Sequence, residues 1–403
     1  MADIIRHDQI GSFLRPASVL DARLAFAEGG ITQEELRAIE DEAIIDILQM
    51  QHETGIGIYS DGEMRRLAWM SGFADAVEGF TEGHRMMHWH NLDGSEEDEA
   101  SLSRVAGAKI RQVRRLTGNE SAFLKEHSPG PYKITMPSPV SVAASGFLVG
   151  VTDQVYADRA EFQKDVLDIV RAEMIALADE GVTYIQLDEG FTGYLGDYAL
   201  YPVDLGGMTK EQALQADIEA ENSLYDAVKR EGLTLAMHVC GGNSRSRWAG
   251  TGGYAGMAEH VFNELHVDRF LLEYDSERAG SFEPLKYLPK GKVVVLGLVT
   301  TKTGKLEDQE ELLRRIDEAS KHVPLDQLAI SPQCGFASLA DGHLISEADH
   351  RRHVQPISIL PHQVVPVGDQ RDRGLQCHKG ANDLNESLDR ADGSRFLGLL
   401  QDT

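Results

Sequence analysis

The sequence predicts an α/β protein, a single (β/α)8 TIM barrel with an insertion near residues 82–130 and an atypical C-terminal tail. Three observations predict this class. Eight apolar, strand-like runs follow one another, most of them separated by segments of helical periodicity, which is typical of a parallel sheet. The length of 403 residues accommodates a barrel of roughly 250 residues with insertions. Polar and reactive residues come at the ends of the runs, where barrels place their active sites.

The helical segments carry recognisable start and stop signals. Thr32 and Glu35 form a capping box at the start of the first clear helix, and Gly55 ends it. A second amphipathic helix is expected from about residue 161 to 181. A third is expected over residues 209–232, again with a capping box at its start.

The strand-like runs end in residues that can bind metals or carry charge. The expected strands are residues 9–13, 55–63, 133–139, 182–190, 233–242, 269–275, 292–298 and 328–335. The residues at or just after their ends are Ser12, Glu63, Ser138, Asp188, His238, Cys240, Glu273, Lys302 and Cys334. The carboxyl ends of barrel strands share one rim, so we expect these side chains to converge.

One stretch interrupts the alternation. Residues 82–125 are polar and include His84, His88 and His90. We interpret this stretch as a solvated excursion over the barrel mouth, with a second metal site as the alternative.

The C-terminal part departs from the pattern in another way. Pro356, Pro361 and Pro366 fall within eleven residues, which a helix interior would not tolerate. We therefore expect a barrel domain over residues 1–350 and an atypical, poorly ordered tail over residues 351–403.

Composition restricts the partners and the compartment. The net charge of −26 argues against a nucleic-acid partner, because a phosphate backbone needs a cationic face. No apolar stretch reaches the roughly 20 residues of a membrane span, and the N-terminus lacks a signal-like region. With only three cysteines, these features predict a cytoplasmic protein whose paired cysteines serve metal binding or catalysis. The oligomeric state stays open.

His238 and Cys240 have the spacing of a zinc-ligand pair. Residues two apart on a strand point to the same face, and imidazole with thiolate suits Zn²⁺. Cys334 lies 94 positions beyond Cys240, on another expected strand, which favours an open catalytic site over a structural one. Glu273 is the best candidate for the missing ligand. Two thiolates, one carboxylate and a neutral imidazole would give Zn²⁺ a net charge of about −1, and such a zinc activates thiols. The alternative is that these are ordinary core residues.

Taken together, the motifs resemble the catalytic C-terminal half of cobalamin-independent methionine synthase, and more closely its single-barrel relatives. The similarity covers residues from about 5 to 350 and rests on IGSF, SDGEMRR, IQLDEG, HVCGG, FLLEYDSER and SPQCGF. The resemblance implies that Ile10, Gly11 and Ser12 hold homocysteine. It places Glu63 near the substrate and Asp188 on the amino group. It also implies the zinc ligands His238, Cys240, Glu273 and Cys334.

Several departures concern the side of the site that would bind the methyl donor. Gly190 replaces the proline of the family's DEP motif, and Lys302 stands where the two-barrel enzymes have a histidine. Residues 100–131 lack the family's basic, proline-rich stretch near folate, and no tryptophan follows MPSPVSV. The N-terminal barrel of the two-barrel enzymes is absent from this sequence. The sequence therefore supports the thiol side of the site more strongly than the donor side.

The resemblance implies zinc-dependent methyl transfer to homocysteine, giving methionine without cobalamin, as in 5-methyltetrahydropteroyltriglutamate–homocysteine S-methyltransferases. The donor, a methyl-folate or another methyl carrier, stays open. Lys302 or Glu63 would supply a proton or a charge partner to the leaving group. One alternative is an epoxide-opening thiol transferase such as epoxyalkane:coenzyme M transferase. Others are the decarboxylases of this superfamily, which need no zinc, and a non-catalytic zinc-binding paralogue.

Overall fold

The computed structural model describes residues 5–196, 207–340 and 342–354. All of them belong to one unit. The expected tail falls outside the described residues from position 355 onward, so its predicted character is not tested. None of the helices in the described ranges is long and apolar enough to cross a membrane.

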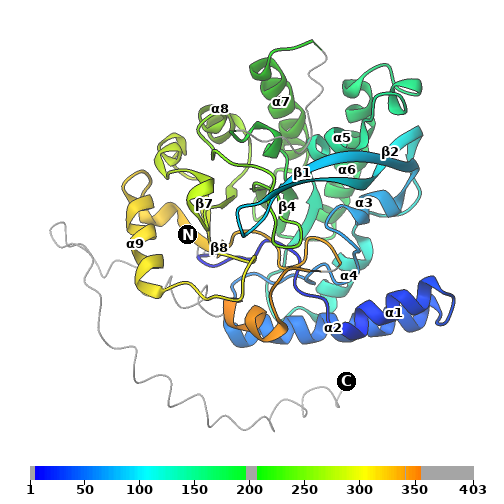
Figure 1. The fold of residues 1–403 in the computed structure, drawn as a ribbon, viewed down its shortest axis with the longest axis horizontal. Helices are drawn as coiled ribbons and strands as arrows, with labels where there is room; N and C mark the ends of the chain where they lie inside the picture. The colour runs from blue at the N-terminus through cyan, green and yellow to red at the C-terminus, as the bar shows by residue number, and fades with distance from the viewer. Residues whose placement is uncertain (1–4, 197–206, 341, 355–403) are drawn as a thin grey trace, which may run out of the picture. The chain divides into compact units, whose positions relative to one another are not determined.

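Helices and strands alternate over most of the unit (Figure 1). The α-helices are α1 (Ala17–Ala27), α2 (Gln33–Thr54), α3 (Ser71–Ala76), α4 (Gly118–His127), α5 (Pro139–Gly146), α6 (Arg159–Asp179), α7 (Lys210–Val228), α8 (Ala258–Glu264) and α9 (Gln309–Ser320). The strands are β1 (Val77–His90), β2 (Glu96–Gln112), β3 (Ile134–Pro137), β4 (Tyr184–Asp188), β5 (Thr234–Val239), β6 (Arg269–Glu273), β7 (Val293–Val299) and β8 (Leu328–Pro332). The capping boxes expected at Thr32 and Thr209 are confirmed, and Gly55 ends α2 in the left-handed conformation.

Six strands form a parallel sheet in the order β3-β4-β5-β6-β7-β8, which is also their order in the chain. Each is hydrogen-bonded to the next, with Asp188 beside His238 and Glu273 beside Gly297. Strand-to-strand connections through helices give this sequential parallel order, so the α/β class predicted from the sequence is confirmed.

The first two expected strands are wrong as strands, although both segments contact the sheet. His7 forms a single parallel bridge with Ile330 of β8, and Tyr59 forms one with Tyr132, just before β3. The backbone N–H of Phe13 also donates to the carbonyl of Gly62 at 3.0 Å. The two edges of the sheet are thus connected through residues 7–13 and 59–62, in the places that strands one and two of a barrel would take.

Side chains replace the missing ladder bonds, which explains why these segments are not strands. The side-chain amide of Gln51 accepts from the N–H of Ser60 at 3.0 Å and donates to its carbonyl at 2.8 Å. Gln186 Nε2 donates to the carbonyl of Ile10 at 2.8 Å. The backbone groups of Ser60 and the carbonyl of Ile10 are therefore satisfied by side chains rather than by a strand ladder.

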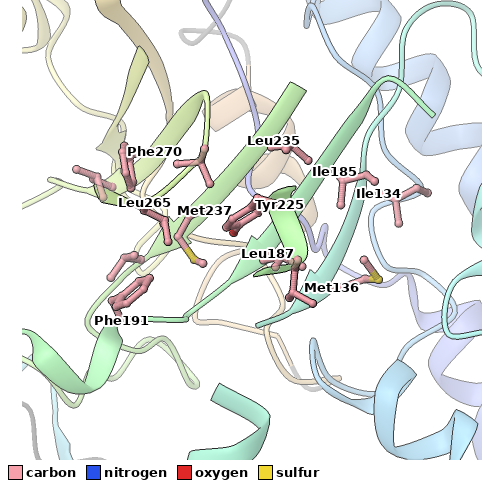
Figure 2. Packing of buried hydrophobic residues seen from close by; sticks show 14 of the residues in the cluster. Ile134, Met136, Ile185, Leu187, Phe191, Tyr225, Leu235, Met237, Leu265 and Phe270 are labelled. Carbon is pink, nitrogen blue, oxygen red and sulfur yellow. The ribbon is translucent and has the colours of Figure 1, made fainter. Parts of the chain in front are cut away.

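The strand residues alternate between two cores. Outward-facing residues pack against the helices, and Figure 2 shows this layer around Ile134, Met136, Ile185, Leu187, Leu235, Met237 and Tyr225 of α7. A second, smaller cluster takes inward-facing residues from seven of the eight expected strand segments: Ile10, Ile58, Tyr184, Ala236, Leu271, Val295 and Ala329. The same alternation places Asp188, His238 and Glu273 on the inward face.

The insertion is an antiparallel ribbon of β1 and β2, which crosses in front of the parallel strands in Figure 1. His90 exchanges backbone hydrogen bonds with Trp248, of 2.8 and 3.2 Å. Met87 and Trp89 form a small buried cluster with Ala249. The ribbon therefore packs on residues 241–250, the loop that follows Cys240 at the end of β5.

Candidate metal and thiol site

The two cysteines and His238 come together as the sequence predicts. One side-chain ligand atom from each of His238, Cys240 and Cys334 lies within 4.8 Å of the others, and all three residues are buried. Both cysteines are free thiols. Nδ1 of His238 is 3.0 Å from the carbonyl oxygen of Leu271, while its buried Nε2 has no hydrogen-bond partner within the described residues. The carbonyl thus orients the ring so that Nε2 can serve as a ligand.

The spacing of the sulfur atoms fits zinc. The two Sγ atoms are 3.7 Å apart. Zinc–sulfur bonds of about 2.3 Å at a tetrahedral angle would place two sulfurs about 3.8 Å apart. Their hydrogen bond lowers the pKa of the Cys334 thiol, and the nearby His238 adds to this effect. The three residues therefore have the chemistry and the separation that a zinc ion requires.

Glu273, the fourth predicted ligand, lies beside this cluster but is turned to other partners. Its Oε2 accepts from the backbone N–H of Gly241 at 2.6 Å, and its Oε1 contacts Arg278. Lys302 Nζ is 3.6 Å from the same Oε1. The carboxylate is thus held by two cations and one backbone N–H, and its role as a ligand stays a prediction.

Lys302 is buried, and its Nζ makes no hydrogen bond among the described residues. Burial, with the nearby charge of Arg278, lowers its pKa to about 8. The contact that the structure gives it is Glu273, on the metal side of the site.

Glu63 and Asp188 are two buried carboxyl groups on neighbouring parts of the rim. Burial raises the pKa of Asp188 to about 7; His238 opposes this rise, and the charge of Glu63 adds to it. Burial also raises the pKa of Glu63, against the charges of Arg66 and Arg15. Gln186 donates to Asp188 at 2.6 Å, and Thr135 donates to Glu63 at 3.0 Å. A cation placed near both carboxylates would stabilise their ionised forms.

The predicted IGSF loop lies between these groups and the metal ligands. Gly11 packs so closely on Glu63 that a Cβ atom would come within 2.4 Å of Oε1. Ser12 packs against Gly335, next to Cys334, and its Oγ accepts from the N–H of Ala337 at 3.3 Å. The carbonyl of Ile10 is held by Gln186. The structure thus places Gly11 against Glu63 and Ser12 beside the turn that carries Cys334, whereas the side chain of Ile10 packs in the inner apolar cluster.

Glu189 is a site residue that the sequence reasoning missed. Cys240 Sγ donates to its Oε1 at 3.3 Å, and burial, with the charge of Cys334, raises its pKa to about 7. Its backbone has φ of 63°, a left-handed conformation that is uncommon outside glycine. The available signal was a second acid directly after Asp188 at the end of a buried run. Arg278, the partner of Glu273, was also missed, and only its basic character pointed to it.

The fold and this cluster define the class: an α/β protein with a parallel sheet, whose strand ends carry a buried His–Cys–Cys group that can hold a metal. The family follows from sequence comparison. The chain belongs to the cobalamin-independent synthase family, whose catalytic-domain model matches residues 7–354.

Relatives and solved structures agree with this assignment. The chain is 37% identical over 361 residues to YxjG, an uncharacterized protein of Bacillus subtilis, covering 88% of this chain and 93% of the relative. It is 25% identical over 332 residues to a methionine synthase of Pyrococcus abyssi, covering 82% and 86%. A crystal structure from Listeria monocytogenes, described as a candidate vitamin-B12-independent methionine synthase, aligns with a TM-score of 0.67 at 27% identity, covering 90% and 98%. A B12-independent methionine synthase from Shewanella sp. W3-18-1, solved with selenomethionine, has the same fold at 18% identity and a TM-score of 0.65, covering 88% and 96%.

Proposed function

We propose that this protein transfers a methyl group to the thiol of homocysteine, without cobalamin, and forms methionine. The observation that carries the proposal is the position of the Asp188 carboxyl group, which is close both to His238 of the cluster and to Glu63. An amino-acid thiol needs a cation-binding anchor at one end and a soft metal site at the other. The family and the methionine synthase relatives support the same reaction.

The residues of this chain have separate tasks in the proposed reaction. His238, Cys240 and Cys334 would hold zinc, with Glu273 as the fourth, replaceable ligand. When bound there, zinc would supply the positive field that lowers the pKa of the incoming thiol. Glu63 and Asp188 would bind the ammonium group of homocysteine, and Ile10, Gly11 and Ser12 would line its path to the metal ligands.

The bond changes are a simple displacement. The thiol sulfur attacks the methyl carbon, a sulfur–carbon bond forms, and the bond from that carbon to the donor breaks. The proton lost from the thiol balances the charge left on the donor. Lys302 would act as the charge partner of Glu273. This ion pair would hold the carboxylate of Glu273 away from the position at the metal that the thiol needs. The donor is a methyl-folate or another methyl carrier.

Metal analysis and thiol binding test this proposal, and neither measurement requires the methyl donor to be known. We expect about one zinc per chain, lost in Cys240→Ser and in Cys334→Ser. Homocysteine should bind the zinc-loaded protein and release a proton, whereas coenzyme M, a thiol with a sulfonate, should bind more weakly. Asp188→Asn should weaken homocysteine binding and leave the zinc content unchanged.

Two outcomes would contradict the proposal. A metal-free protein that still forms methionine from homocysteine and 5-methyltetrahydrofolate would remove the role of the cluster. Tight binding of coenzyme M with none of homocysteine would point to the epoxide-opening class instead.

A further inference from the structure

The outer face of the β1–β2 ribbon gathers two histidines and two carboxylates. His88 and His90 are two residues apart on β1, and their direct partners on β2 are Asp98 and Glu96. Residues two apart on a strand share a face, and so do direct cross-strand partners. All four side chains therefore project from the same side of the ribbon.

The rings are arranged around the carboxylate of Glu96. Nε2 of His88 is 3.5 Å from Glu96 Oε2, and Nδ1 of His90 is 3.2 Å from Glu96 Oε1. One ligand atom from each of these three residues lies within 4.8 Å of the others. Asp98 Oδ1 is 2.8 Å from Nδ1 of His88, which leaves Nε2 of that ring facing Glu96. This carboxylate–histidine contact is the kind that orients metal-binding histidines.

His90 is held in place by the loop below it. Its ring stacks on Trp248, with centroids 5.9 Å apart and an interplanar angle of 17°. The backbone bonds between the same two residues fix the strand end as well. One of the two imidazoles is thus oriented before any ion arrives, which reduces the entropic cost of binding.

The charges on β2 are divided between its two faces. Glu97 and Glu99 pair with Arg247 on the side that faces the loop. Glu96 and Asp98 instead contact the imidazoles of His88 and His90. With both histidines neutral, this group carries a net charge of about −2, which a divalent ion would neutralise. Imidazole and carboxylate together suit zinc, nickel and copper.

We propose that His88, His90 and Glu96 bind a divalent transition-metal ion, with Asp98 orienting His88. This ribbon site is distinct from the His238–Cys240–Cys334 cluster. Because His88 and His90 are on β1 and Glu96 is on β2, the ion would link the end of β1 to the start of β2, beside the loop that follows Cys240. The proposal does not depend on the reaction proposed above.

Nickel titration at pH 8, of protein supplied with only one zinc equivalent per chain, tests this site. Trp89 lies between the two histidines on β1, and Trp248 stacks on His90, so Ni²⁺ should quench tryptophan fluorescence. Equilibrium dialysis should give one Ni²⁺ per chain beyond the zinc. His88→Ala and His90→Ala should each weaken Ni²⁺ binding at least about tenfold, and Asp98→Asn should weaken it less. If His90→Ala disturbs the ribbon, His88→Gln provides a second test, because position 88 is half-exposed and the change should keep the ribbon intact.

Two control variants separate this site from casual binding to surface histidines. His84→Ala removes an exposed histidine on the same face of β1. His266→Ala removes a histidine that is 2.7 Å from Asp226 elsewhere on the surface. Both should bind Ni²⁺ like the wild type. The proposal fails if the His88→Ala/His90→Ala double variant keeps the extra Ni²⁺, or if His266→Ala loses as much binding as His88→Ala.

Discussion

Gly11→Ala is the sharpest test of how the proposed substrate anchor is built. A Cβ atom at Gly11 would lie 2.4 Å from Glu63 Oε1 and 3.3 Å from its Cδ. Ordinary contact begins at 3.4 Å, so the carboxylate would have to withdraw by 3.4 − 2.4 = 1.0 Å. Glu63 is buried and its Oε1 is held by Thr135 and Arg66, so the carboxylate has little freedom to do so.

The expected cost follows from the contacts that this shift would break. Glu63 Oε1 accepts from Thr135 Oγ1 at 3.0 Å and lies 3.4 Å from Arg66 Nη1. Overpacking costs about 1–3 kcal/mol, and a hydrogen bond to a charged group is worth about 1.5–3 kcal/mol. We expect the free energy of unfolding to fall by about 2 kcal/mol. Homocysteine binding should weaken about 10- to 100-fold, since 1.4 kcal/mol is a factor of ten.

Calorimetric titration of homocysteine into the zinc-loaded variant measures this effect, and urea unfolding reports its stability. Zinc content should not change, because the three atoms nearest to the added Cβ belong to Glu63 and Thr135. Gly256→Ala is the matched control, because the nearest atom to its added Cβ is the carbonyl oxygen of Tyr194 at 3.8 Å. Suppose that the Gly11→Ala variant is folded and zinc-loaded and binds homocysteine as tightly as the wild type. Glu63 is then not the anchor for the ammonium group.

Three further changes have expected outcomes. Arg278→Met leaves the buried carboxylates of Glu273 and Asp275 without their shared cation, so the free energy of unfolding in urea should fall by about 3–5 kcal/mol, whereas Arg278→Lys should lose less. Glu189→Gln weakens the contact with Cys240 and should lower zinc affinity about tenfold in a chelator competition, with thiol binding retained at saturating zinc. Removal of zinc by a chelator should lower the thermal midpoint, because an ion at 1,000 times its Kd stabilises the folded state by about 4 kcal/mol; an unchanged midpoint would contradict a zinc site in the folded core.

The sequence predicts those features that depend on short-range chemistry. The capping boxes at Thr32 and Thr209 involve residues three apart, and both are present. His238 and Cys240 are two apart on a strand, so their shared face follows from the backbone geometry alone. The convergence of Cys334 follows from the order of parallel strands, because their carboxyl ends lie at one edge of the sheet.

The sequence does not show where a distant side chain replaces a backbone hydrogen-bond partner. Residues 9–13 and 55–63 read as strands because they are apolar, yet Gln51 and Gln186 take the places of their ladder partners. A local pattern cannot show that a side-chain amide on a helix or on another strand will replace a backbone neighbour. The same holds for Glu189, whose left-handed backbone turns its side chain toward Cys240.

Glu273 shows the boundary between what sequence and structure can establish. Its identity as an acid near the cluster follows from the end of an apolar run, whereas its partners Gly241, Arg278 and Lys302 emerge only in three dimensions. This carboxylate lies near the metal cluster, but two cations and one backbone N–H also stabilise it away from the cluster. That arrangement favours a ligand that can be exchanged, because the charge of Glu273 stays compensated when it is away from the metal. An exchangeable fourth position is what an incoming thiol would need.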